Sequence, residues 1–272
     1  MKILSIDVGI KNLAFCLLDH HSVEKWGVVD LTEDLRQKCC FKNKGVSCTA
    51  DAKFMKNDSM FCLRHAKKQV DILIPTKEMK KSHMNKLSIM DLQALADRHE
   101  IPYLPSTKKK ELIDDLSNYF EKQAFSEVDN VSASDIDLVL VGKTLKEKFN
   151  SLFDDVEELE RVVIENQISP IANRMKTLQG MIAQYFIMKD ESIIIDFVSA
   201  SNKLKLCIED ETEKVEINGL TYNQRKKLGV TRCEKIVKDN YIEWYQFFTN
   251  NKKKDDLADA FLQGKWYLTN RC

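Results

Sequence analysis

The chain has 272 residues, 43% hydrophobic and 31% charged, so it can hold one domain of ordinary size plus one or two small modules. Lys and Arg together number 42, as do Asp and Glu, and this zero net charge argues against a uniformly basic nucleic-acid binder. No apolar run reaches the roughly 18 residues of a membrane span, and the N-terminus resembles neither a signal peptide nor an Arg-rich presequence, so we expect an intracellular protein with no membrane partner.

The charges are unevenly distributed along the chain. Residues 36–90 hold 13 Lys/Arg against 4 Asp/Glu, whereas residues 111–160 hold 4 against 14. The basic block is the natural place for contacts with phosphate groups. The alternative is two solvated faces of opposite charge.

The start of the chain predicts three consecutive strands. The segments 2–7, 12–19 and 22–30 read KILSID, NLAFCLLD and SVEKWGVVD, which are rich in β-forming residues and separated by short turns of Gly, Asn and His. Residues 36–75 follow and are rich in Cys and Lys, with little helical or strand periodicity.

A helical pattern comes next. Residues 87–121 predict two short helices joined by a turn that contains Pro. Leu92 and Leu95 lie on one face of the first helix, and Ser106-Thr107 is the expected N-cap of the second.

Helices and strands alternate in the rest of the chain. The predicted elements are a helix at 138–153, a strand at 161–165, a helix at about 172–188, a strand at 192–198, and helices at 221–239 and 254–268. This order predicts an α/β fold with a mixed five-stranded sheet flanked by helices. The core consists of residues 1–35 and 123–272, with a Cys-rich insertion at 36–82 and a small helical module at 83–122.

Four carboxylates occupy positions from which they could meet. Asp7 ends the first strand before a Val-Gly turn, Glu165 ends the strand RVVIE, and Asp256 and Asp259 share a face at the start of the last predicted helix. Taken singly, Asp7 could be a turn residue, and the helix pair could interact with the helix dipole. Together, convergent carboxylates need a compensating cation, and Mg²⁺ prefers such oxygen ligands.

The motifs IDVGIKNLA, VVIENQ followed by Arg174-Met175, TYNQRKKLGV and DDLADAF occur in this order. In residues 1–30 and about 138–268 the chain resembles the RuvC-like, poxvirus-type Holliday junction resolvases of the ribonuclease H fold superfamily, and their yeast mitochondrial relatives. The resemblance implies a ribonuclease H-like fold and a structure-selective endonuclease that uses two Mg²⁺ ions, with Mn²⁺ a possible substitute. It further implies branched DNA as the partner, no small-molecule substrate, and a homodimer for symmetric cutting.

The resemblance also implies roles for individual residues. Asp7, Glu165, Asp256 and Asp259 would be the catalytic metal ligands, with Asp255 ranked lower because a helix turns it about 100° away from Asp256. Two lysines, Lys203 and Lys226, would place positive charge near the reacting phosphate. The candidates for positioning phosphates are Gln167, Arg174, Arg225 and Lys227.

Four cysteines and a histidine suggest a second metal site. The pattern CC-x7-C-x13-C-x2-H brings together Cys40 (or Cys39), Cys48, Cys62 and His65. Three thiolates and one imidazole suit a tetrahedral, structural Zn²⁺, and a short Lys-rich segment without a large core needs such a staple. The alternative is free thiols with an incidental histidine.

The helical module resembles a SAP module, a small helical fold of DNA-binding proteins. Lys108, Lys109 and Lys110 at the start of its second helix would present positive charge and N–H groups to phosphate. The alternative is a helical hairpin that binds nothing.

Two other functions remain open. One is a ribonuclease H-like nuclease that acts on flaps or RNA–DNA hybrids, and the other is a non-catalytic DNA-binding scaffold that uses the zinc and SAP-like modules. The expected compartment is the cytoplasm, in a viral factory if the protein is viral, or the nucleus.

Overall fold

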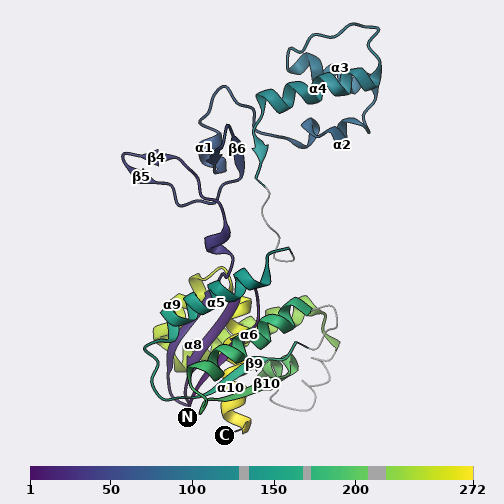
Figure 1. The fold of residues 1–272 in the computed structure, drawn as a ribbon. Coiled ribbons are helices and arrows are strands. Elements are labelled where there is room, and N and C mark those ends of the chain that lie inside the picture. The colour runs from purple at the N-terminus through teal and green to yellow at the C-terminus, as the bar shows by residue number, and fades with distance from the viewer. Residues whose placement is uncertain (129–134, 168–172, 208–218, 272) are drawn as a thin grey trace. The chain divides into compact units, whose positions relative to one another are not determined.

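The structure is a computed structural model that describes residues 1–128, 135–167, 173–207 and 219–271. The chain divides into two compact units, which we name the core unit (Met1–Asp34 with Ser132–Cys272) and the inserted unit (Leu35–Val131). Figure 1 labels several elements of each unit. Among the described residues, no helix combines the length and the apolar character needed to cross a membrane.

The core unit is built on a mixed five-stranded sheet (Figure 1). Its strands are β1 (Lys2–Asp7), β2 (Leu13–Leu18), β3 (Val23–Val29), β9 (Leu159–Glu165) and β10 (Ile194–Val198). The order across the sheet is β10-β9-β1-β2-β3, in which β1, β9 and β10 are parallel and β2 is antiparallel to both of its neighbours. The predicted α/β fold class, with a mixed five-stranded sheet flanked by helices, is confirmed.

Helices cover both faces of this sheet. They are α5 (Leu138–Phe153) and α6 (Asn173–Lys189) on one face, and α8 (Tyr222–Asn240), α9 (Ile242–Asn250) and α10 (Lys254–Arg271) on the other (Figure 1). Strand β2 is therefore buried along its whole length. Its alternate side chains serve opposite faces: Phe15 contacts Phe153 of α5 with ring centroids 5.1 Å apart, whereas Cys16 joins the cluster under α10.

Helix α9 is absent from the sequence-based prediction, because its sequence IEWYQFFTN is rich in aromatic residues that favour strands. Tertiary packing decides its conformation. The indole N–H of Trp244 donates to the Val23 carbonyl at 3.0 Å, and Phe248 stacks on Trp26 with centroids 5.3 Å apart. The other predicted helices of the core unit occur within a few residues of their expected bounds.

Gly264 allows helix α10 to lie close to the sheet. A Cβ atom at this position would come within 2.8 Å of Leu18 Cδ2 and 3.0 Å of Ser5 Cβ, both buried. We expect Gly264→Ala to destabilise the core unit by about 1–2 kcal/mol, because overpacking outweighs the gain in helix propensity. Urea unfolding followed by Trp fluorescence measures this, since all three tryptophans lie in the core unit.

Gly180→Ala is the matched control for this substitution. Gly180 also lies inside a helix, α6, and a Cβ atom there would meet nothing within 4 Å. It should stabilise the core unit by about 0.5–1 kcal/mol through helix propensity alone. Equal effects of the two substitutions would contradict the close approach at Gly264.

The Cys-rich part of the inserted unit contains short elements that its sequence does not predict. They are two hairpins, β4 (Lys42–Asn43) with β5 (Val46–Ser47) and β6 (Phe54–Lys56) with β7 (Ser59–Phe61), and the one-turn helix α1 (Leu63–Ala66). Strand β8 (Ser126–Glu127) pairs with β6, and Phe125 packs against Phe54. The inserted unit therefore extends beyond residue 123, the position at which we expected the chain to return to the core.

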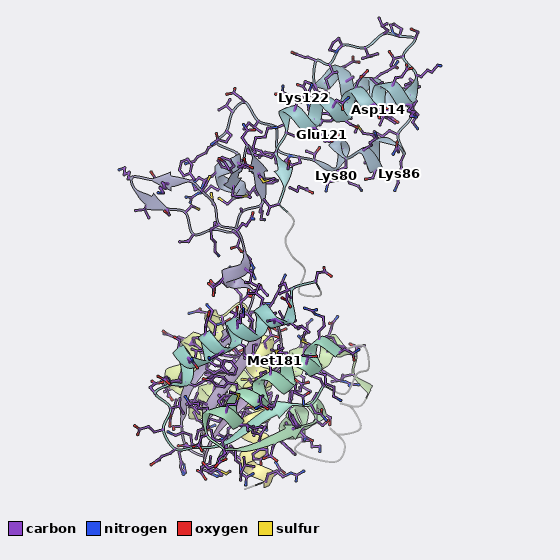
Figure 2. The ribbon with its side chains drawn as sticks, viewed as in Figure 1. Lys80, Lys86, Asp114, Glu121, Lys122 and Met181 are labelled. Carbon is purple, nitrogen blue, oxygen red and sulfur yellow. The ribbon has the colours of Figure 1, made fainter. Side chains whose placement is uncertain are left out.

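The helical part of the inserted unit comprises the 3₁₀ turn Lys77–Met79, α2 (Lys81–Met84), α3 (Ile89–Arg98) and α4 (Lys109–Gln123). A cluster that includes Leu92, Leu95, Leu112 and Leu116 packs between them. Exposed charged residues such as Lys80, Lys86 and Lys122 lie around this cluster (Figure 2).

The predicted N-cap of α4 is wrong. The N-cap is Lys108, whose N–H donates to Glu111 Oε2 at 3.2 Å. The Thr107 hydroxyl instead accepts from the Leu104 N–H at 3.2 Å, in the preceding turn. By contrast, Ser88 caps α3 in a capping box with Asp91.

Candidate active site and Cys/His site

Asp7 and Glu165 end two neighbouring parallel strands. The register pairs Ser5 with Val163, so residues two further along each strand lie side by side on the same face. The carboxyl ends of such strands are where α/β folds place ligands. A Cβ atom at Gly9 would come within 2.5 Å of the Asn12 carbonyl oxygen, so the turn directly after Asp7 requires glycine.

Helix α10 adds two carboxylates to this position. Asp256, Asp259 and Gln263 recur at intervals of three and four, which places them on one face of the helix. The buried Gln263 amide lies within 3.2 Å of Ser5 Oγ and of the Ile6 and Val163 carbonyl oxygens, to which it donates. This amide therefore fixes α10 against β1 and β9.

Lys203 connects three of the carboxylates. It lies on the 3₁₀ segment Ala200–Cys207, which follows β10, and its side chain is only 7% exposed. Its Nζ atom is 2.9 Å from Asp7 Oδ1, 2.8 Å from Glu165 Oε2 and 3.2 Å from Asp259 Oδ2. One buried ammonium thus holds together carboxylates from two strands and one helix.

The protonation of this cluster follows from burial and proximity. Burial raises the pKa of Asp7 to about 7, against the opposing charge of Lys203. Burial also acts to raise the pKa of Glu165, but its hydrogen bond with Asp7 and the Lys203 ammonium bring that pKa below its usual value. Of the two carboxyl groups, Asp7 therefore takes up a proton more readily than Glu165.

Lys203 is protonated despite its burial. Burial alone would lower the pKa of this amine, but the charges on Asp7, Asp259 and Glu165 outweigh burial and raise it. The side chain therefore stays an ammonium throughout the accessible pH range.

Asp256 carries a carboxylate oxygen without a partner. Its Oδ2 atom is buried and makes no hydrogen bond in the described part of the chain. Burial, together with the charges on Asp255 and Asp7, raises its pKa to about 6. An unsatisfied buried carboxylate oxygen beside other carboxylates is the kind of donor that a hard cation would satisfy.

Replacing Lys203 with Met should destabilise the core unit in metal-free buffer, by about 3–5 kcal/mol at about pH 8, because the buried carboxylates lose their ammonium. Without that charge their folded-state pKa values lie well above the unfolded ones. At about pH 5 the carboxyl groups of the variant are protonated, so the core unit keeps most of its stability. As the pH rises through their raised pKa values, these groups must ionise without a nearby cation, and that stability is lost. Urea unfolding by Trp fluorescence at both pH values measures the loss, and an equal loss at both would contradict this account.

Lys226 forms its ion pair with Asp255 rather than with the three carboxylates that Lys203 contacts. Its Nζ atom is 2.7 Å from Asp255 Oδ2 and 5.5 Å from the centroid of the Tyr222 ring. Lys226→Met is therefore a suitable control for Lys203→Met, since a pair about one third exposed contributes at most about 1 kcal/mol. Asp255, ranked below Asp256 from the helix geometry, is the residue that Lys226 binds.

The other predicted phosphate contacts have different surroundings. Arg174 donates to the Ile136 carbonyl, and Arg225 donates from Nε to the Leu220 carbonyl at 3.0 Å. The Gln167 N–H donates to Gln179 Oε1 at 3.1 Å, and Lys227 is exposed on α8. Among the described residues, no hydrogen bond or ion pair joins the side chain of Gln167, Arg174 or Lys227 to the carboxylate cluster.

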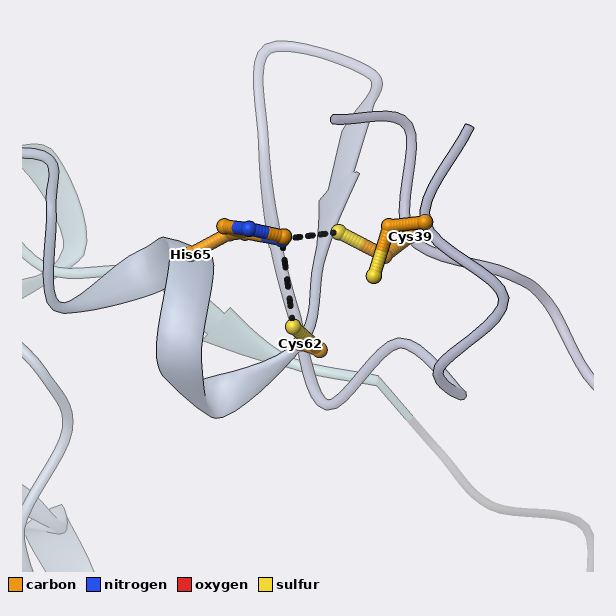
Figure 3. Close-up of side chains that lie close together, drawn as sticks. Cys39, Cys62 and His65 are labelled. Carbon is orange, nitrogen blue, oxygen red and sulfur yellow. Dashed lines mark hydrogen bonds between the residues drawn. The ribbon is translucent and has the colours of Figure 1, made fainter. Parts of the chain in front are cut away.

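A second candidate site lies in the inserted unit, where Cys39, Cys48, Cys62 and His65 place one ligand atom each within 4.8 Å of the others. The imidazole Nδ1 of His65 is 3.3 Å from the Cys39 sulfur and 3.4 Å from the Cys62 sulfur (Figure 3). Burial and the nearby charges of Arg64 and Lys68 lower the pKa of His65, which favours the neutral imidazole that a metal binds.

The choice of Cys40 as the first ligand is wrong, and the alternative Cys39 is the one that faces the cluster. The Cys39 N–H donates to the Ala50 carbonyl, and the next N–H, of Cys40, donates to the Met60 carbonyl. In such extended backbone, successive side chains point in opposite directions. Cys39 is therefore buried, as Cys62 and His65 are, and Cys40 is exposed.

The three lysines at the start of α4 are exposed, as a DNA-binding role requires. The Lys109 ammonium donates to the Asn85 carbonyl at 3.1 Å, which leaves Lys108 and Lys110 as the more available of the three.

Sequence reasoning missed Gln263, whose amide joins the strands and the helix that carry the carboxylates. The available signal was a polar residue four positions after Asp259, within the otherwise apolar part of α10.

No protein-family model matches the chain. An uncharacterised protein, L451, of Acanthamoeba polyphaga mimivirus is 26% identical over an alignment 318 positions long, which covers 98% of this chain and 74% of the relative. Among solved structures, that of the yeast mitochondrial Holliday junction resolvase Ydc2 matches with a TM-score of 0.37 and 15% identity, covering 98% of this chain and 77% of that chain. At this TM-score the likeness carries no conclusion about activity.

Proposed function

We propose that this chain is a Mg²⁺-dependent, structure-selective DNA endonuclease that cuts four-way junctions symmetrically by phosphodiester hydrolysis. The observation that carries the proposal is the meeting of Asp7, Glu165 and Asp259 at one buried lysine, beside two adjacent strand ends. The resemblance of the motifs that contain these residues to those of RuvC-like resolvases supports the choice of substrate.

The donor set fits a hard divalent cation. It offers carboxylate oxygens, including the buried Asp256 Oδ2, for which the described residues provide no hydrogen bond. Asp7, Glu165, Asp256 and Asp259 would hold Mg²⁺, or Mn²⁺ in its place. When bound, two such ions supply an activated water and stabilisation of the leaving oxygen.

The chain's own residues then have separate tasks. Lys203 holds the strand-end carboxylates and Asp259 together and favours their ionised forms. With Lys226 it places positive charge where a phosphate in reaction gains negative charge. Gln263 fixes the distance between α10 and the strands.

We assign supporting roles to the inserted unit. The Cys39, Cys48, Cys62 and His65 cluster would bind a structural Zn²⁺, which a short segment with a small apolar core needs. The SAP-like module would contact DNA backbone through Lys108 and Lys110. Symmetric cutting of two strands requires two active sites, so the active form would be a homodimer in a cell nucleus or in viral factories.

A substrate panel tests the proposal. The purified chain is incubated in Mg²⁺ buffer with a synthetic four-way junction, a linear duplex, a flap and an RNA–DNA hybrid of matched sequence. We expect paired, symmetric nicks in the junction and no comparable cutting of the linear duplex.

The same panel separates the alternative functions. If the chain cuts the flap or the hybrid in preference to the junction, the proposed active site stands, but the proposed substrate is wrong. Binding of the junction without cleavage of any substrate, in Mg²⁺ or in Mn²⁺, would contradict the nuclease and favour a DNA-binding scaffold.

A further inference from the structure

The Cys/His site has an excess of positive charge on its surface. The stretch 36–75 contains nine Lys/Arg and three Asp/Glu, and one of these acids, Asp51, already pairs with Arg36 and Lys38. Six of the remaining cations are exposed and form no ion pair with any described residue, and five of these six belong to the β4–β5 hairpin or to α1 and the two residues after it. We name these five the basic patch: Lys42, Lys44, Arg64, Lys67 and Lys68.

The basic patch is built around the histidine of the cluster. The Phe41 ring stacks on His65 with centroids 4.0 Å apart, and the Lys68 ammonium lies 5.4 Å from the centroid of the Phe41 ring. Arg64 Nη2 lies 3.4 Å from His65 Nε2. Lys42 follows Phe41 directly and begins the β4–β5 hairpin. The fold therefore holds Arg64 and Lys68 at the Phe41–His65 stack, with Lys42 directly beside it in the chain.

The contact between Arg64 and His65 requires an acceptor once a metal is bound. A metal on Nδ1 leaves the proton on Nε2, which then donates, and a guanidinium has no acceptor. Metal-binding histidines usually donate this N–H to a carboxylate or carbonyl group, but none contacts Nε2 in the residues that the structure describes. Two donors 3.4 Å apart suit an oxygen placed between them, such as a phosphate oxygen.

We infer that the basic patch binds the phosphate backbone of duplex DNA, as a second DNA contact separate from the carboxylate site and from the lysines of α4. The inference rests on the proposed function, because the DNA bound would be an arm of the branched substrate. A duplex is favoured over a single strand because the nearest aromatic ring, Phe41, is already covered by His65 and Lys68, and single strands require free aromatic faces.

Salt-dependent binding by the full chain tests the inference. Fluorescence anisotropy gives Kd for a labelled duplex, a labelled single strand and a four-way junction at about 50–200 mM salt, without added Mg²⁺ so that none is cut. Arg64→Gln/Lys68→Gln should raise Kd roughly 10-fold or more and reduce the slope of log K against log salt by about 2, because each substitution leaves one phosphate group without its cation.

The matched control is a variant in which two other lysines of the inserted unit, both already in ion pairs, are replaced. Lys80 and Lys81 pair with Glu127 and Asp114, so Lys80→Gln/Lys81→Gln should change the slope much less. Because Arg64 touches a metal ligand, a second variant, Lys42→Gln/Lys44→Gln, alters only the hairpin, and zinc content is measured for every variant. If this hairpin variant and a zinc-bound Arg64/Lys68 variant both keep the wild-type slope, the inference is overturned.

The two proposals can fail separately. If the wild-type chain cuts junctions and the patch variants retain the wild-type slope and Kd, the basic patch is not a DNA site and the nuclease stands. If the patch variants bind weakly and the wild-type chain cuts nothing, the basic patch is a DNA site on a protein that is not a nuclease. A slope that falls only with single-stranded DNA would overturn the choice of duplex.

Discussion

Asp7→Asn is expected to reduce cleavage of a four-way junction by about 10³-fold or more, because it removes the carboxylate that lies between β9, α10 and the Lys203 ammonium. The amide keeps the size of the side chain but cannot neutralise a divalent cation. Glu165→Gln should have a similar effect. Single-turnover cleavage in Mg²⁺ measures the loss, and anisotropy on the same junction measures binding.

Both variants should still bind the junction that they fail to cut. Kd for the junction should change by less than about threefold, since neither residue lies on a basic surface. Asp34→Asn is a matched control: this exposed aspartate pairs with Lys148, and its replacement should leave cleavage at the wild-type rate. Wild-type cleavage by Asp7→Asn would show that Asp7 is not a catalytic residue. Loss of junction binding together with loss of cleavage would indicate a general defect in folding.

Cys39→Ser should abolish zinc binding by the inserted unit and unfold its Cys-rich part. A structural Zn²⁺ site contributes about 10–16 kcal/mol of apparent binding free energy at pH 7, far more than a cluster as small as Phe54, Ala66 and Phe125 can replace. Native mass spectrometry should detect one zinc ion per wild-type chain and none in the variant. Hydrogen exchange should show loss of protection at 36–75.

The neighbouring cysteine is the control. Cys40→Ser changes an adjacent, exposed thiol, and it should retain both zinc and protection. The Trp fluorescence of the core unit should be unchanged in both variants, because the three tryptophans lie outside the inserted unit. Loss of zinc in Cys40→Ser and its retention in Cys39→Ser would reverse the assignment.

The strands and their terminal carboxylates were predictable because each signal is local. A buried strand such as RVVIE appears as an apolar run, and Glu165 follows directly from where the run ends. The helix face that contains Asp256 and Asp259 follows from a period of 3.6 in the same way. The sheet then brings the two strand ends together without further information.

The details that escaped prediction depend on contacts between distant parts of the chain. The spacing of the cysteines allows either Cys39 or Cys40, and only the backbone pairing with Ala50 and Met60 decides which one faces inward. Helix α9 forms because Phe248 packs on Trp26, more than two hundred positions earlier. Gln263 is significant only through the carbonyl groups that it reaches.

The hydrogen bond between Gln263 and Ser5 has a consequence for folding, because the two residues are 258 positions apart in the chain. Strands β1 and β2 pack directly against α10. During synthesis these N-terminal strands therefore cannot complete their packing until the C-terminal helix has been made. The inserted unit makes its own clusters within Leu35–Val131 and can fold while the ribosome is still adding the rest. A nascent chain would thus present a folded inserted unit before the carboxylates of Asp7 and Asp259 can meet.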